Sequence, residues 1–290
     1  MNTALKLSAY GAALAVLVAG TYSVGTAVGP VFANSPTQSA PTQSAPAHVD
    51  DHAATTSGHE PGGLASTSDE YTFVPDTTTL GSGTFAFRIT GPDGVPVTAF
   101  DQVHDRQLHL IVVRRDATGF QHVHPERDAA GTWRVPLTLP AGGVYRAFAD
   151  FTPTGGPETT LGVDLFAPGD FQPVAQAPSR TSTVDGYTVT LDGELVPGAT
   201  SPLRLNVTRD GAPVTDLQPY LGAYGHLVAL RGGDLAYLHV HPGSTATSGP
   251  VVGFDAEVPS AGTYRMFFDF QVGGVVRTAD FTVTTAGSPA

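Results

Sequence analysis

One stretch of this sequence occurs twice, and that internal repeat constrains the fold more than any other feature. The two copies, residues 109–125 and 226–242, both follow the pattern H-x12-H-x-H-P without an insertion. A second shared block follows each copy, GVYRAFADF at 143–151 and GTYRMFFDF at 262–270. A repeat of this length indicates two tandem copies of one domain.

The residue composition favours short strands over helices. The chain of 290 residues has 34 Gly and 24 Pro, and Val, Thr, Phe and Tyr recur in short runs between them. Such a composition is typical of strands joined by tight turns. We therefore expect an all-β protein with two tandem antiparallel β-sandwich domains, at residues 69–168 and 182–285, joined by a Pro- and Gln-rich connector at 169–181.

Two segments of the first domain show the expected strand patterns. Residues 84–90, TFAFRIT, alternate between apolar and polar positions, as a strand with one buried face does. Residues 108–114, LHLIVVR, are largely apolar on both faces, which predicts a central strand. Neither domain contains a segment with the length and period of a convincing helix.

Residues 1–33 form a long apolar segment that ends in Val31-Phe32-Ala33. It predicts either a signal peptide with a small-residue cleavage site or a single transmembrane anchor. The apolar run is longer than the roughly 7–15 residues of a signal core, which favours the anchor. Both alternatives predict an exported protein, extracellular or membrane-anchored and facing outside. The chain would contact the membrane through this segment if it stays uncleaved.

Residues 34–68 predict a disordered linker, because they are rich in Pro, Ser and Thr and have few large apolar residues. The pentapeptide PTQSA occurs twice in tandem at 36–45. The segment contains His48, His52 and His59. We interpret these histidines as part of a solvated linker rather than a metal-gathering arm, since binding would have to order them.

Charge and cysteine content exclude several classes of protein. The net charge of −12 argues against nucleic acid as a partner, because phosphates require a basic surface. The chain has no Cys, which excludes disulfides, thiolate zinc sites, iron–sulfur clusters and blue-copper centres. Any bound metal must therefore be held by imidazole and carboxylate groups.

The repeated histidines are the candidates for metal ligands. The last two His of each copy lie two residues apart on an expected strand, so their imidazoles project from one face. The first His of each copy lies one strand earlier, and the register, which the sequence does not fix, decides whether it shares that face. The Asp of each shared block either orients an imidazole or binds the ion itself. The candidate metal ligands are His109, His122, His124, Asp150, His226, His239, His241 and Asp269.

Three further residues bear on these candidates. Arg146 and Arg265 are competing partners for the Asp of their own block. His104 has no counterpart in the second copy, where Leu221 takes its place, and we expect a surface histidine there.

Imidazole and carboxylate together suit a divalent metal ion such as Cu(II), Zn(II) or Ni(II), and the affinity order favours copper over zinc. The leading hypothesis is an extracytoplasmic protein that binds copper and sequesters it or hands it on. The rival hypothesis is a non-enzymatic envelope interaction module, in which the His and Asp side chains form structural hydrogen-bond clusters.

An enzyme is the least favoured alternative. HVHPE at 122–126 resembles the His-x-His and Glu of cupins, yet Gly243 replaces Glu126 in the second copy and the later cupin His is missing. The sequence shows no Ser-His-Asp arrangement with a nucleophile elbow, no phosphate loop and no Cys nucleophile. We therefore predict a protein that is not an enzyme, with a cupin-like metal enzyme as the remaining alternative.

The strings HLIVVRRDATGFQHVHPE, LQPYLGAYGHLVALRGGDLAYLHVHP and GTYRMFFDFQVGGVVRTADF resemble a family of exported bacterial proteins with two tandem HxHP β-domains. Its members are described as secreted or heavy-metal-binding-domain proteins. The single domains are also similar to YtkA-like and CopC-type extracytoplasmic domains. The resemblance implies Ig-like or cupredoxin-like sandwiches in the cell envelope, with metal-transport proteins as partners. CopC-type sites use an N-terminal His that this chain lacks, so no ligand is transferred from them.

Overall fold

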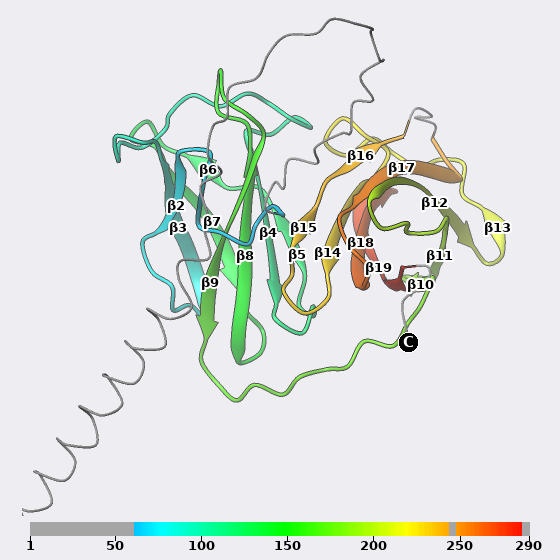
Figure 1. Ribbon diagram of the computed structural model, residues 1–290. Helices are drawn as coiled ribbons and strands as arrows, with labels where there is room; N and C mark the ends of the chain where they lie inside the picture. The colour runs from blue at the N-terminus through cyan, green and yellow to red at the C-terminus, as the bar shows by residue number, and fades with distance from the viewer. Residues whose placement is uncertain (1–60, 244–247, 286–290) are drawn as a thin grey trace, which may run out of the picture. The chain divides into compact units, whose positions relative to one another are not determined.

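The computed structural model describes residues 61–243 and 248–285, and Figure 1 shows that these residues form strands and loops without a helix. The predicted all-β class with two tandem domains is confirmed. The predicted anchor or signal peptide and most of the predicted linker, with its three histidines, lie outside the described residues. Within the described residues, no helix has the length and apolar character needed to cross a membrane.

Two antiparallel sheets form the first sandwich, with strand orders β1-β2-β3-β7-β6 and β5-β4-β8-β9. The strands of the first sheet are β1 (Thr67–Ser68), β2 (Tyr71–Pro75), β3 (Ser82–Thr90), β6 (Glu126–Arg127) and β7 (Thr132–Thr138). Those of the second sheet are β4 (Leu108–Arg114), β5 (Gln121–Val123), β8 (Gly143–Phe151) and β9 (Thr159–Ala167).

The two predicted strand patterns have different structural causes. On β3, Phe85, Phe87 and Ile89 are fully buried in the core of the first sandwich, while the side chains between them are partly exposed. On β4, all residues are buried. One face of β4 packs into that core, and the other face, with Ile111 and Val113, packs against the second sandwich. A strand covered on both faces has to be apolar on both.

The second sandwich repeats this plan, with strand orders β10-β11-β12-β17-β16 and β15-β14-β18-β19, and with β13 paired to β12. The strands of its first sheet are β10 (Thr181–Val184), β11 (Tyr187–Asp192), β12 (Ala199–Arg209), β13 (Ala212–Pro213), β16 (Val240–Pro242) and β17 (Val251–Val258). Those of its second sheet are β14 (His226–Arg231), β15 (Tyr237–Leu238), β18 (Thr263–Val272) and β19 (Val275–Thr284).

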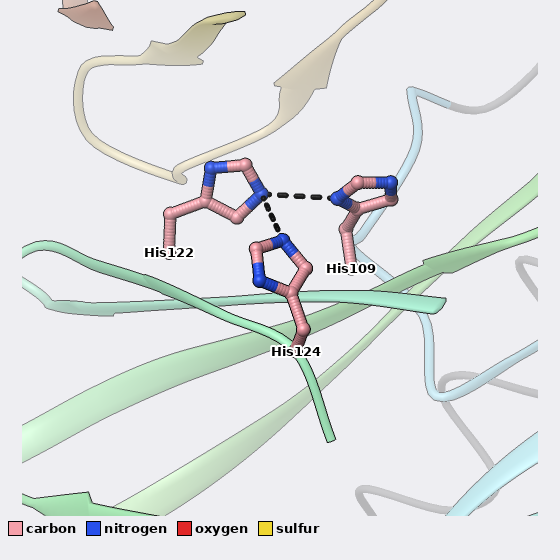
Figure 2. A group of neighbouring side chains, drawn as sticks. All are labelled: His109, His122 and His124. Atoms are coloured by element: carbon pink, nitrogen blue, oxygen red, sulfur yellow. Dashed lines mark hydrogen bonds between the residues drawn. The ribbon is translucent and has the colours of Figure 1, made fainter. Parts of the chain in front are cut away.

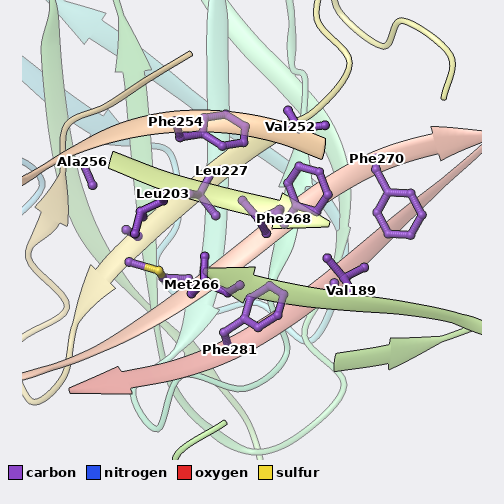
Figure 3. Packing of buried hydrophobic residues seen from close by; sticks show 14 of the residues in the cluster. Val189, Leu203, Leu227, Val252, Phe254, Ala256, Met266, Phe268, Phe270 and Phe281 are labelled. Atoms are coloured by element: carbon purple, nitrogen blue, oxygen red, sulfur yellow. The ribbon is translucent and has the colours of Figure 1, made fainter. Parts of the chain in front are cut away.

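Aromatic side chains from both sheets fill the core of the second sandwich, as Figure 3 shows. The rings of Phe254 and Phe268 meet edge-on, with their centroids 6.0 Å apart. Phe268 and Phe270 stack at 5.6 Å, and Phe281 on β19 is fully buried in the same cluster. Burial of each such side chain stabilises the fold by ~1.5–3 kcal/mol.

A separate apolar cluster, here called the interface cluster, joins the two sandwiches. Its buried residues are Ile111, Val113, Ala117 and Phe148 from the first sandwich, and Val228, Leu230, Leu235 and Phe267 from the second. The ring of Phe120 stacks on that of Phe267 with a centroid distance of 4.1 Å and an interplanar angle of 5°. Equivalent faces of the two copies therefore pack against each other.

The chain just before β1 binds to both sandwiches. The Gly62 carbonyl accepts a hydrogen bond of 2.9 Å from the Tyr237 amide, and the Gly63 amide donates one of 2.8 Å to Thr160. The buried Arg146 guanidinium donates to the carbonyls of Gly63 and Leu64, both at 2.7 Å. Gly63 has a φ of +74°, and a Cβ there would lie 2.4 Å from the Phe148 ring, so only glycine fits this position.

Candidate metal centre

The register of β4 and β5 brings three histidines of the first copy onto one face. Ile111 on β4 is directly opposite His122 on β5, so both side chains project to the same side of the sheet. His109 lies two residues away on β4, and His124 directly follows the end of β5, two residues after His122; both share that side. It is the side occupied by the interface cluster, so all three imidazoles point out of the first core and towards the second sandwich.

The three imidazoles converge on one point, as Figure 2 shows. His109 Nδ1 lies 3.0 Å from His122 Nε2, and His124 Nε2 lies 3.3 Å from the same atom. Among the described residues, these are the His and carboxylate side chains that offer three ligand atoms within 4.8 Å of one another. We call His109, His122 and His124 the histidine triad.

Two triad imidazoles have an oxygen acceptor on their other ring nitrogen. His122 Nδ1 lies 2.8 Å from Oδ2 of Asp269, which belongs to β18 of the second sandwich, and both side chains are buried. The other carboxylate oxygen of Asp269 accepts a hydrogen bond of 2.5 Å from the Thr278 hydroxyl. His109 Nε2 lies 3.0 Å from the Val103 carbonyl. Metal-binding histidines in proteins are held in the same way, by a carboxylate or a backbone carbonyl.

These acceptors determine which ring nitrogens carry the protons. A carbonyl or a carboxylate can only accept, so His109 donates through Nε2 and His122 donates through Nδ1. When both imidazoles are neutral, the remaining nitrogens, Nδ1 of His109 and Nε2 of His122, are lone pairs that face each other at 3.0 Å. Two lone pairs at this distance repel each other, and a cation bound by both of them relieves the repulsion.

Burial keeps two triad members, His109 and His124, in the neutral form that metal binding requires. Loss of hydration lowers the pKa of His109 to about 3, with the imidazoles of His122, His226 and His104 adding to the shift. Burial likewise lowers the pKa of His124 to about 3, and His122 and His109 contribute. Both imidazoles are therefore unprotonated at neutral pH, and an ion would not have to displace a proton from them.

The second copy does not repeat the triad. His226 is placed as His109 is, with its Nε2 donating to the Tyr220 carbonyl at 2.7 Å. The ring of His226 is 6.0 Å from that of His122 and 4.9 Å from that of His104, so it lies beside the first-copy site. His239 and His241 are exposed, and their rings stack on each other with centroids 5.8 Å apart.

His239 and His241 are separated from His226 because the chain of the second copy passes from one sheet to the other sooner than that of the first copy. In the first copy the chain stays paired with β4 through Val123 and joins the other sheet at Glu126. In the second copy it leaves β14 after Leu238 and joins β17 already at Val240. The expectation of a second trio is therefore wrong in its geometry, because the last two His of that copy follow the other sheet.

The two predicted aspartates also differ. Asp269 accepts a hydrogen bond from His122 across the two sandwiches, and its role in orienting a metal-binding imidazole stays a prediction. Asp150, its counterpart, lies across the sheet from His109 but accepts its hydrogen bond, of 3.0 Å, from the Thr160 hydroxyl and forms none with a triad imidazole. Burial raises the pKa of Asp150 to about 6, and the negative charge of Glu158 adds to the shift.

The two arginines bind other carboxylates. Arg146 forms an ion pair of 3.0 Å with Asp164, and Arg265 forms one of 2.6 Å with Asp280. Neither competes for the aspartate of its own block. His104, expected at the surface, is half-buried, and its ring lies 6.2 Å from that of His109.

Three of these features have no signal in the sequence. It did not indicate that the partner of His122 comes from the other copy, because both copies carry the same Asp. It did not indicate the place of His226 and His104 beside the triad. Glu158, which lies 3.9 Å from His239, has no repeated counterpart that would have drawn attention to it.

Comparison with solved structures returns β-proteins of low similarity. The Escherichia coli adhesin FdeC is 15% identical, with a TM-score of 0.23 over 76% of this chain and 65% of that chain. Salmonella alpha-2-macroglobulin is 14% identical, with a TM-score of 0.26 over 79% of this chain and 15% of that one. A marsupial T cell receptor is 11% identical, with a TM-score of 0.24 over 74% of this chain and 99% of that one. This chain thus spans less than two thirds of the first two proteins, and TM-scores this low carry no functional argument.

No curated protein matches the chain. The resemblance to YtkA-like and CopC-type domains stays a prediction. Residues 66–165 and 182–287, which hold the two copies of the repeat, each match a family described as "Domain of unknown function (DUF8832)". Since these two segments make up more than half of the sequence, the protein belongs to the DUF8832 family and carries its domain twice.

Proposed function

We propose that this protein binds one divalent transition-metal ion at the histidine triad. The observation that carries the proposal is the convergence of three imidazole nitrogens: His122 Nε2 lies 3.0 Å from His109 Nδ1 and 3.3 Å from His124 Nε2. An ion bound tetrahedrally by imidazoles at ~2.0–2.1 Å separates its ligand nitrogens by about 3.3 Å. Two of the three nitrogen–nitrogen distances in the triad, 3.0 and 3.3 Å, are close to this separation, and all three ligand atoms lie within 4.8 Å of one another.

The ligand set narrows the choice of ion. Three neutral imidazoles suit copper, zinc or nickel and disfavour calcium and magnesium, which prefer oxygen ligands. The affinity order places Cu(II) above Zn(II), so copper is our first candidate. With three protein ligands, one position stays open for water or for a ligand of a receiving protein.

An open position suits a protein that holds an ion and passes it on. We place this function outside the cytoplasm, on the basis of the apolar N-terminal segment in the sequence. The ion would be sequestered there or handed to envelope metal-transport proteins. Binding rather than catalysis is the proposed activity.

Isothermal titration calorimetry of the full chain with Cu(II) and Zn(II) tests the proposal. We expect one tightly bound equivalent for the wild type, and none for His122→Ala. His241→Ala is the matched control, because it removes an exposed imidazole of the repeat that is not part of the triad. Equal binding by the His122→Ala and His241→Ala proteins would refute the site.

The His122–Asp269 contact also favours a second candidate function. It joins the two sandwiches through a buried bond, as a purely structural histidine would. The protein would then be a non-enzymatic interaction module of the envelope. Absence of binding heat in the wild-type titration, together with loss of stability in His122→Ala, would support this alternative.

A further inference from the structure

A cavity of about 160 Å³ lies against the triad and reaches residues of both sandwiches. Its buried wall includes His109 and His122, while His239 and Glu158 also line it and are each about half exposed, at 50% and 49%. It is large enough to hold several water molecules or a hydrated ion. The cavity therefore connects solvent with two of the three triad imidazoles.

The exposed end of this cavity carries a pair of groups suited to a cation. His239 Nδ1 lies 3.9 Å from Glu158 Oε1, a distance that one ion can bridge when it binds both atoms at ~2.0–2.2 Å. His241 lies beside His239 and lines the same cavity. We call His239 and Glu158 the capture pair. Neither residue of the capture pair belongs to the histidine triad or to the interface cluster.

Further polar groups lie between the capture pair and the triad. The walls include Asp150, His104 and His226. The rings of His104 and His226 are 4.9 Å apart, and His226 is 6.0 Å from His122, so imidazoles follow one another at close steps. The Nε2 of His226 is bound to the Tyr220 carbonyl, which leaves its Nδ1 as a lone pair. An ion that moves along this wall keeps meeting nitrogen and carboxylate ligands as it loses water.

We propose that His239 and Glu158 form an outer metal-capture site, through which a divalent transition-metal ion enters the cavity and reaches the histidine triad. This inference rests on the proposed function of the triad. The proposal gives a role to the His-x-His segment of the second copy, which pairs with the other sheet and does not join His226. The carboxylates of Glu158 and Asp150 on the cavity wall offer the entering ion oxygen ligands as it loses water.

A route and a final binding site differ in their kinetic signature. A residue that only assists passage lowers the barrier in both directions, so its loss slows association and dissociation equally and leaves Kd unchanged. A ligand of the bound ion has the opposite effect, because its loss accelerates dissociation and weakens Kd. Stopped-flow mixing of the full chain with Cu(II) chloride, followed by quenching of intrinsic fluorescence, measures association. Mixing the loaded protein with excess chelator measures dissociation.

We expect the double variant His239→Ala/Glu158→Gln to show both rate constants lowered by the same factor, ~10-fold, with Kd unchanged. Glu70→Gln is the control, because it makes the same charge change at an exposed turn residue that does not line the cavity. An unchanged association rate constant, or a changed Kd, would overturn the capture role while leaving the triad intact. A wild-type protein that takes up no copper would overturn the metal site and the capture role together.

Discussion

At the scale of single residues, Asp269 decides how well His122 can bind an ion. Its carboxylate fixes the proton on Nδ1 of His122 and directs the lone pair of Nε2 towards His109 and His124. Loss of such an outer acceptor lowers metal affinity by about 10–100-fold in other sites. We expect Asp269→Asn to weaken copper binding by that factor, measured by calorimetry.

The repeat supplies a matched control for this substitution. Asp150 occupies the equivalent position on β8 and is also bonded to a threonine hydroxyl, but although it lies across the sheet from His109, no hydrogen bond joins it to a triad imidazole. Asp150→Asn should therefore weaken copper binding less than Asp269→Asn does, because it breaks no hydrogen bond to a triad imidazole. A similar loss of affinity in both variants would show that Asp269 acts through general stability and does not orient His122.

Buried neutral histidines also make the stability of the metal-free protein depend on pH. Burial lowers the pKa of His226 to about 4, below the ordinary value of 6.5 that it regains on unfolding. The unfolded chain then binds more protons between these values, so stability is complete above pH 6.5 and falls as the pH decreases towards 4. Asp150, whose pKa is raised to about 6, has the opposite sign and offsets part of the loss.

Urea unfolding in the presence of a chelator measures this dependence. We expect the wild type to lose stability from pH 7 to pH 5, with about 1–2 kcal/mol of the loss due to His226. His226→Gln should lose less over the same interval. His241→Gln, a change at an exposed histidine, should keep the wild-type dependence. Identical pH profiles for all three proteins would contradict a buried neutral His226.

At the scale of strands, the repeat predicts much of the fold but not the details of pairing. The alternation in residues 84–90 and the apolar run at 108–114 correctly predict β3 and β4, because these patterns follow from which faces are covered. The i, i+2 spacing places His122 and His124 on one face. The sequence leaves the register of β4 and β5 open, since it depends on the whole loop between them.

The sheet crossing explains why two nearly identical stretches build different sites. The pairing ends two residues earlier in the second copy: the first copy stays with its partner strand to Val123, and the second leaves it after Leu238, the counterpart of Gln121. Local pattern does not reveal such a difference, because both segments are equally suited to a strand. Nor does it reveal that outer faces of the two copies pack together and bring Asp269 to His122. The contact between Asp269 and His122 depends on how the two sandwiches pack, which a local sequence pattern does not encode.

At the scale of the whole molecule, metal binding and packing of the two sandwiches should be coupled. The triad belongs to the first sandwich and Asp269 to the second, so the complete site exists only when the interface cluster is packed. By linkage, a change that loosens this packing weakens binding of the ion, and bound ion stabilises the packing by the same free energy.

Phe267→Leu tests this coupling without touching the site. Phe267 is buried in the interface cluster and stacks on Phe120, and leucine removes the stacking while keeping an apolar side chain. We expect copper affinity to fall by ~5-fold or more, with a smaller gain in urea stability on adding copper than the wild type shows. Phe281→Leu removes a ring of the second core instead, so it should lower stability while copper affinity is retained. Equal copper affinities in the two variants would mean that the first sandwich binds the ion alone. The hydrogen bond between Asp269 and His122 would then add nothing to metal affinity.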